Sequence, residues 1–189
     1  MNKFENKNSN SLINLKEDHL LIWDVVSYIN KYLYETEECD RLDIDLISSI
    51  IEFFNTFVVS LHFAKEEEIL FSELKKMIAI ENNLGQLLTE LELEHTDIKA
   101  LIIQLIIIKK SYDVGNNSVT NEMIELLKEI TKKYVEHIKK EDEQLITQLS
   151  NYLSPSRLVT LDYELLLFNQ TTTRHIFRDL IAERYRNNY

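Results

Sequence analysis

Residues 51–69, IEFFNTFVVSLHFAKEEEI, decide the fold of this chain. Their apolar side chains recur every three or four positions, which is the period of one face of an α-helix. That face reads Ile51, Phe54, Val58, His62, Glu66, Ile69, so a histidine and an acid interrupt an apolar row. Residues four apart lie on the same side of a helix, so His62 and Glu66 can present a nitrogen and an oxygen to one point. The stretch therefore predicts a core helix whose apolar face includes a histidine and a glutamate able to bind one metal ion together.

Three further segments show the same helical period, and each carries one histidine on its apolar face. The four predicted helices cover residues 11–34, 43–77, 84–112 and 118–150. Short polar links separate them, and short links favour antiparallel neighbours. The chain contains only two glycines and one proline, so the turns that many strands require are nearly absent. The sequence predicts an all-α, up-down-up-down four-helix bundle.

The chain outside the bundle is predicted to be a flexible start and a helical end. The expected division is a flexible N-terminus at 1–10, the bundle at 11–153 and a C-terminal helical extension at 154–189. Ser154 and Pro155 are typical of a helix start, and this helix should end near Phe168, with a sixth helix over 174–186. The helix that begins at Ser154-Pro155 has apolar residues that either pack on the bundle or form a homodimer contact. They are Leu158, Leu161, Leu165, Leu166 and Phe168.

The four helical histidines are expected to meet in one layer of the core. They are His19, His62, His95 and His137. In an antiparallel pair, two residues lie at one level when they are equally far from the connecting turn. The midpoints between successive histidines fall at 40–41, 78–79 and 116, in or near predicted links. Imidazoles buried with Glu66 and Glu141 need compensation, which divalent metal supplies, and two carboxylates able to bridge indicate two ions.

The motifs of the chain resemble those of the hemerythrin/HHE cation-binding family, over residues 12–149. The matching features are a histidine on the first helix (His19), HFAKE on the second (His62 to Glu66), Glu94-His95 on the third and HIKKE on the fourth (His137 to Glu141). The resemblance implies two iron ions bridged by an oxo or hydroxo group. It places His19 and His62 on one iron, His95 and His137 on the other, and Glu66 and Glu141 between them.

One position departs from the oxygen carriers of that family. They have a second histidine four residues after the one on the third helix, where this chain has Lys99. A lysine ammonium should turn toward solvent or toward a carboxylate such as Glu94. The open site that results resembles the family's sensors and iron-centre repair proteins, with O2, NO or peroxide as the small ligand. The alternatives are a repair or peroxide-decomposing protein with weak peroxidase or oxidase activity, and a structural bundle held by zinc or a single metal.

Composition and charge exclude several other functions. The formal net charge of −11 disfavours nucleic acid and anionic membranes as partners. The longest apolar run, 100–108, is interrupted by Gln104 and is too short to span a bilayer, and residues 1–11 have no apolar leader. A single Cys39 forms no internal disulfide. We therefore expect a cytoplasmic protein without a phosphate-binding loop or a nucleophilic serine.

Overall fold

The computed structural model describes residues 12–39, 42–77 and 82–168, and within these ranges every regular element is a helix. The predicted all-α class is confirmed. In chain order the elements are α1 (Ile13–Cys39), α2 (Ile44–Glu52), η2 (Phe53–Phe63), η3 (Glu66–Phe71), α3 (Ser72–Lys75), α4 (Asn82–Asp113), η4 (Asn117–Val119), α5 (Thr120–Lys140), η5 (Glu141–Leu145), η6 (Ile146–Gln148), α6 (Leu149–Tyr152) and α7 (Pro155–Phe168). The segments η2, η3 and η5 are π-helical.

Helix boundaries follow local capping chemistry. Asp43 caps α2, because its carboxylate accepts a hydrogen bond of 2.9 Å from the backbone N–H of Leu46. Gly115 adopts a φ of 98° in the turn after α4, a conformation that favours glycine. The predicted end of α1 at Tyr34 was wrong, since the helix continues to Cys39. Residues 35–38 contain no glycine or proline that would stop it.

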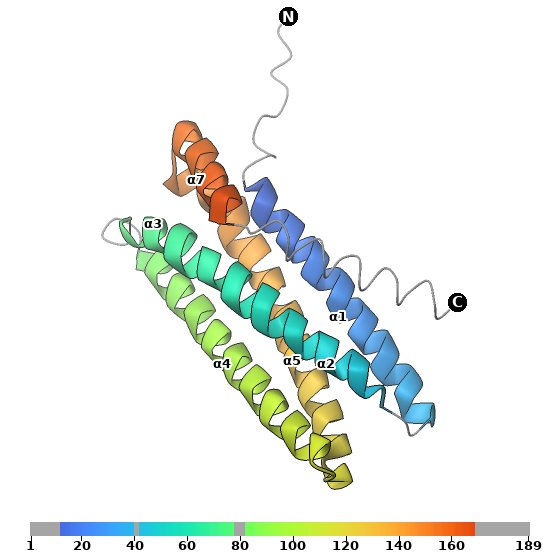
Figure 1. Cartoon of the computed structure of the whole chain (residues 1–189). Helices are drawn as coiled ribbons and strands as arrows, with labels where there is room; N and C mark the ends of the chain where they lie inside the picture. Colours follow the sequence, from blue (N-terminus) through green and yellow to red (C-terminus); the bar gives the residue numbers. More distant parts are fainter. Residues whose placement is uncertain (1–11, 40–41, 78–81, 169–189) are drawn as a thin grey trace, which may run out of the picture.

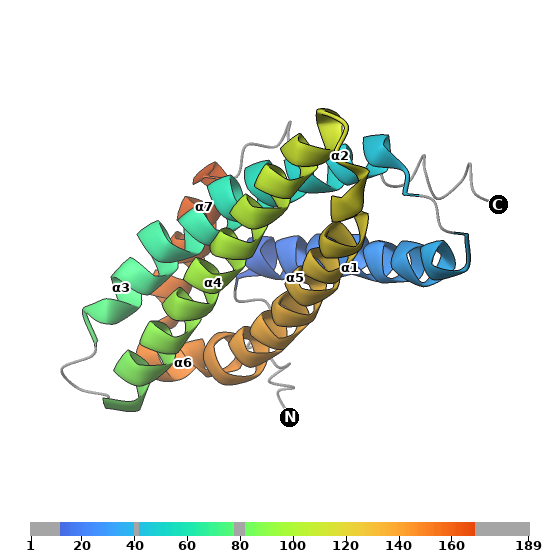
Figure 2. The same cartoon turned by 90° about the horizontal axis from the view of Figure 1, so that it is seen from below.

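The long helical segments lie side by side (Figures 1 and 2). Helix α5 contacts both α1 and α4, and η2 contacts α1 and α4 on the other side of the core. Each of these four segments therefore has two neighbours, and their inner faces enclose one interior. Helix α7 folds back over one end of this interior, where it contacts α1, η3 and α6.

The apolar core is divided into two clusters. One cluster includes Ile22, Val58, Phe63, Ile98 and Tyr134, and the other includes Leu15, Leu70, Leu91 and Leu145. On each long segment the predicted ligands stand between a member of one cluster and a member of the other. A polar layer therefore crosses an otherwise apolar interior at the level of the histidines.

The C-terminal extension packs on the bundle through α7. This helix begins at Pro155 and ends at Phe168, as predicted. Its leucines Leu158, Leu161 and Leu165 are buried in the second apolar cluster, beside Leu12 and Leu74. The predicted sixth helix over 174–186 and the flexible start at 1–10 lie outside the described residues.

One helical segment, Ile44–Lys75, is long and apolar enough to cross a membrane by length and composition alone. Among the described residues this segment passes that test over an 18-residue window, which is longer than the apolar run at 100–108. Core helices of water-soluble proteins pass the same test, so one such helix is weak evidence of a span. In this structure the segment places Leu46, Phe54 and Val58 in the apolar core.

An ion-pair network joins α7 to the bundle. Arg157 Nε donates a hydrogen bond of 2.8 Å to Glu73, and its two terminal nitrogens lie 3.0 and 3.1 Å from the carboxylate of Glu164. Hydrogen bonds from Arg157 and then Lys76 lower the pKa of Glu73 to about 2. The network therefore stabilises the packing of α7 only while Glu73 is ionised.

We predict that Arg157→Met lowers the free energy of unfolding by about 1–2 kcal/mol at pH 7, because it removes a partly buried charged hydrogen bond. The pKa of Glu73 is lowered in the folded state, so its stabilisation is present above the unfolded value of 4.5 and is lost as the pH falls toward 2. The difference in free energy of unfolding between Arg157→Met and wild type should therefore shrink as the pH falls from 4.5 toward 2. Urea unfolding at several pH values measures it. Glu125→Gln, in an exposed pair with Lys128, is the control and should change stability by less than about 0.5 kcal/mol.

Candidate metal centre

The six predicted ligands are contributed by all four long helical segments. His19 lies on α1, His62 and Glu66 on η2 and η3, His95 on α4, and His137 and Glu141 on α5 and η5. Each of these residues is at most 3% exposed. The wide turns of π-helix, which recur at functional sites, occur where the second and fourth segments carry their His-x-x-x-Glu pairs. The structure brings all six predicted residues together.

A first group of donor atoms contains His19, His62, Glu66 and Glu141. His62 Nε2 lies 3.1 Å from Glu66 Oε1, and His19 Nε2 lies 3.4 Å from the same oxygen. His19 Nε2 also lies 3.3 Å from Glu141 Oε2. One donor atom from each residue lies within 4.8 Å of the others, so the four could hold a single metal ion.

A second group contains His95, His137 and again Glu66. His95 Nε2 lies 3.3 Å from Glu66 Oε2 and 3.1 Å from His137 Nε2. Glu141 Oε2 lies 3.7 Å from His137 Nε2, so this acid also stands between the two groups. The two oxygens of Glu66 face different histidines, which is the arrangement of a carboxylate that can bridge two ions.

Buried polar atoms at the centre support metal binding. Within the described residues, both ring nitrogens of His62, Glu66 Oε2, both carboxylate oxygens of Glu141 and the Tyr134 hydroxyl make no hydrogen bond. Buried polar atoms without partners cost free energy, and carboxylates cost more than neutral groups. Imidazole nitrogens and carboxylate oxygens that converge without hydrogen bonds fit divalent iron, manganese or zinc.

Each histidine has a second carboxylate behind it, on the side away from the centre. The Nδ1 atoms of His19, His62, His95 and His137 face Asp142 (2.9 Å), Asp18 (3.8 Å), Glu67 (2.7 Å) and Glu94 (3.0 Å), respectively. A carboxylate at one ring nitrogen fixes the imidazole orientation and directs the other nitrogen toward a metal. All four Nε2 atoms are thereby turned to the interior.

These four carboxylates form a closed ring around the helices. Each one is the sequence neighbour of a predicted ligand on one helix, and it serves the histidine of the next helix. The order is Asp18 of α1 to His62, Glu67 of η3 to His95, Glu94 of α4 to His137, and Asp142 of η5 to His19. We call this set the carboxylate ring. It connects all four long segments at the level of the centre.

Three members of the carboxylate ring are paired with lysines. Lys65 pairs with Asp18, Lys99 with Glu67 at 2.7 Å, and Lys140 with Glu94. Lys99 was expected to turn toward solvent or a carboxylate such as Glu94, and the structure corrects that partner to Glu67. Lys65 is fully buried, and the sequence analysis missed it because a lysine inside HFAKE resembles a surface residue.

Electrostatics tie the imidazoles to the acids. Burial opposes a charge on His95, but the facing carboxylates of Glu66, 3.3 Å from Nε2, and Glu67, 2.7 Å from Nδ1, outweigh it and raise its pKa to about 9. Burial likewise opposes ionisation of Glu94, and hydrogen bonds from His137 and Lys140 nevertheless lower its pKa to about 2. Burial also opposes a charge on His19, but its hydrogen bond to Asp142 and the facing carboxylate of Glu141, 3.3 Å from Nε2, raise its pKa well above the usual value. Protons therefore balance the acids in the metal-free protein, and a metal must displace them.

Aromatic residues border the centre on the side of the first apolar cluster. Phe63 stacks on His95 with ring centroids 3.8 Å apart, and Tyr134 stacks on Phe63 at 5.7 Å. The Tyr134 ring lies 5.9 Å from that of His137. Burial, and then the charges of Glu66 and Glu141, raise the pKa of Tyr134, so its hydroxyl keeps its proton. Tyr134 therefore lies beside the candidate ligands, with its ring 6.4 Å from that of His62 as well.

A helical interior that gathers four histidines and two glutamates is typical of a helical cation-binding protein. The sequence model of the hemerythrin HHE cation-binding domain matches residues 11–149. The chain therefore belongs to the hemerythrin HHE cation-binding family, and the resemblance inferred from the sequence is confirmed. No curated protein and no solved structure that we compared with the chain matches it.

We predict that Glu67→Gln weakens Fe(II) or Co(II) binding by about 10- to 100-fold, because it weakens the support behind His95. Glu68→Gln is the matched control: it makes the same change in charge one residue later, at an exposed position. Competition titration against a chelator measures both variants, with circular dichroism to verify the fold. An equal loss in both variants would show that only net charge matters and that the carboxylate ring has no specific role.

Proposed function

We propose that this protein is a non-haem di-iron protein that handles or senses O2, NO or peroxide in redox or iron homeostasis. The observation that carries the proposal is the position of Glu66, whose two oxygens face two separate groups of histidines. A single-ion site would need only one such group. The contacts among α1, η2, α4 and α5 also support the up-down-up-down bundle as the scaffold.

The residues of the chain have separate roles in this proposal. His19 and His62 would hold one ion, His95 and His137 the other, and Glu66 and Glu141 would lie between them. Iron, when bound, would supply redox chemistry and open coordination positions for a small ligand. The apolar clusters on both sides exclude water from the layer, and the carboxylate ring keeps each imidazole oriented.

Lys99 supports a sensing or handling role over reversible oxygen carriage. Its ammonium is paired with Glu67 at 2.7 Å, so it lies behind His95, on the side of Nδ1, and is not among the groups of donor atoms at the centre. A cation held there does not ligate a metal. The second ion is therefore left with two histidines and the shared acids, which leaves room for a ligand.

We predict about two iron ions per chain after reconstitution under anaerobic conditions, and about one or none in His137→Ala, because removing one ligand opens the second group. Inductively coupled plasma mass spectrometry and the near-ultraviolet spectrum of the oxidised protein measure this. Lys139→Ala, at an exposed position two residues further on, is the control and should keep both ions. Zinc as the preferred metal, or one ion per chain in wild type, would favour the alternative of a structural metal that only stabilises the bundle.

We predict that Tyr134→Phe leaves iron content unchanged but speeds NO release about tenfold, because the buried hydroxyl would donate a hydrogen bond to the bound ligand. Stopped-flow spectroscopy measures the release. In the metal-free protein the variant should be as stable as wild type or more so, since it removes an unsatisfied hydroxyl. Unchanged NO release would contradict a role for Tyr134. If the iron-loaded wild-type protein, mixed with hydrogen peroxide in place of NO, decomposes many equivalents of peroxide, the peroxide-decomposing alternative would be favoured.

The partners and location remain part of the proposal. The protein would be cytoplasmic, and the net charge of −11 disfavours nucleic acid and anionic membranes as partners. A homodimer through the C-terminal extension is supported by the outer face of α7, where Val159, Tyr163 and Leu167 are exposed within the described chain. These residues recur every four positions, so they form one apolar strip on the helix.

A further inference from the structure

The carboxylate ring is asymmetric. Lysines pair with three of its acids, and each lysine follows the histidine of its sector by three or four residues: Lys65 after His62, Lys99 after His95, Lys140 after His137. After His19 the corresponding positions hold Ile22 and Trp23. No lysine or arginine of the described chain lies within ion-pair distance of Asp142, which contacts His19 at 2.9 Å.

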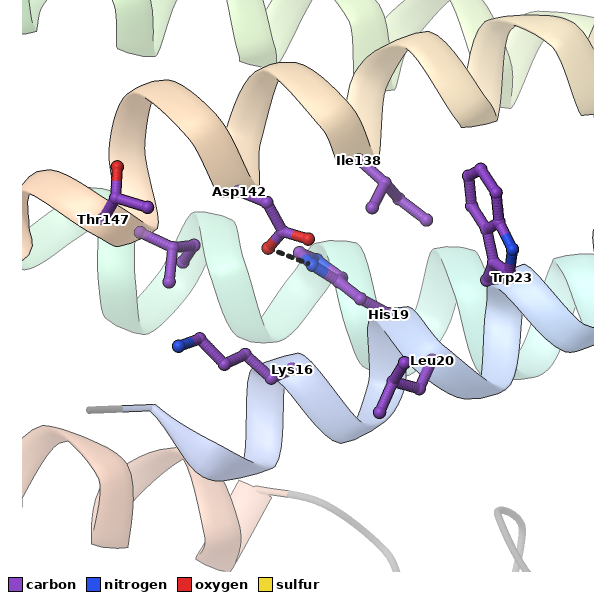
Figure 3. Close-up of a pocket in the computed structure, with 8 residues that line it drawn as sticks. Lys16, His19, Leu20, Trp23, Ile138, Asp142 and Thr147 are labelled. Carbon is purple, nitrogen blue, oxygen red and sulfur yellow. Dashed lines mark hydrogen bonds and ion pairs between the residues drawn. The ribbon is translucent and has the colours of Figure 1, made fainter. Parts of the chain in front are cut away.

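A pocket opens where the fourth lysine is missing. It has a volume of about 420 Å3 and lies between α1 and the junction of α5 with η5. Figure 3 shows the Asp142–His19 pair in its wall, with Lys16 and Trp23 on opposite sides of that pair. The volume falls within the range of pockets that bind small organic molecules. The pocket therefore gives outside molecules access to the carboxylate ring.

The lining of the pocket is mainly apolar. Leu20 and Trp23 are 66% and 46% exposed, and Ile138 and Ile146 form buried parts of the wall. The Asp142 side chain is 43% exposed, so an incoming molecule can reach it. A carboxylate and an indole ring that line one apolar pocket favour an organic cation, because its ammonium can pair with the acid while its apolar part contacts the ring. The net charge of −11 also attracts cations.

We propose that this pocket binds a small primary amine with an apolar body, whose ammonium pairs with Asp142 as lysines pair with the other three acids of the carboxylate ring. The apolar body would lie against Leu20, Trp23 and Ile138. Asp142 accepts a hydrogen bond from His19 Nδ1 at 2.9 Å, so the bound amine is one residue away from a candidate metal ligand. The pocket thus couples an organic cation to the metal centre.

Trp23 is the only tryptophan of the chain, so its fluorescence reports directly on the pocket. Titration of the metal-free full-length protein with hexylammonium should shift its emission. Hexanol and hexanoate should bind about fivefold more weakly, because they lack the charge that pairs with Asp142. Equal binding of hexanol, or tighter binding of hexanoate, would overturn the proposal. The titration uses no metal, so its failure is separate from failure of the proposed iron function.

Variants test the charge pairing. Asp142→Asn should reduce hexylammonium affinity about fivefold and remove the preference over hexanol, whereas Glu143→Gln, at the exposed neighbouring position, should leave both unchanged. Lys16→Met should tighten hexylammonium binding, because the Lys16 ammonium lines the same pocket and repels a cationic ligand. Tighter hexylammonium binding by wild type than by Lys16→Met would overturn the assignment of charge. The Trp23 emission could instead depend on protein concentration and not respond to the amine. That result would show that a second copy of the chain covers the pocket, and it would also overturn the proposal.

Coupling to the centre has its own measurement. When two binding sites are coupled, each ligand changes the affinity of the other by the same factor. Saturating hexylammonium should therefore change the Co(II) affinity of the wild-type protein at least threefold. It should leave the Co(II) affinity of Asp142→Asn unchanged. Equal Co(II) affinity in wild type would overturn the coupling.

Discussion

The structure depends on the mutual compensation of acids and imidazoles in one buried layer. Glu66 and Glu141 are inaccessible to water, and a carboxylate in an apolar interior is expensive unless charge or hydrogen bonds offset it. Histidines from four helical segments supply this compensation. The packing of the helices therefore has to satisfy two conditions at once: apolar clusters must close on both sides, and the polar atoms must meet at the same level.

The same layer explains why the fold and the centre cannot be separated. Glu66 contacts His62 on its own segment, His19 on α1 and His95 on α4. Three helical segments are thus held in register by one side chain, and a metal would strengthen contacts that already exist. Metal binding in such a site contributes directly to folding stability. The candidate metal centre is therefore also a structural element of this bundle.

Local patterns in the sequence account for much of this arrangement. The helical period and the level argument identified His19, His95 and the His-x-x-x-Glu pairs, because those signals lie within single helices. The partners behind the histidines could not be found in this way. Asp18 faces His62 across 44 positions of sequence, and such pairing depends on how the helices rotate against each other. Buried Lys65 was missed for the same reason, since only the tertiary neighbour Asp18 makes its burial tolerable.

In the carboxylate ring each acid contacts the histidine of the next helix, and this arrangement constrains how sequences of this family can diverge. Each helix carries a candidate ligand and, next to it in sequence, the acid that contacts the histidine of the next helix. Rotation of one helix therefore displaces both its own ligand and the acid behind a neighbouring histidine. A substitution such as Asp18→Asn on α1 affects His62 on another helical segment. Substitutions that preserve function should therefore appear as compensating pairs across neighbouring helices, and an alignment of relatives should show covariation running once around the bundle. The sector of His19, which opens to a pocket in place of a lysine, is where such an alignment should be most permissive.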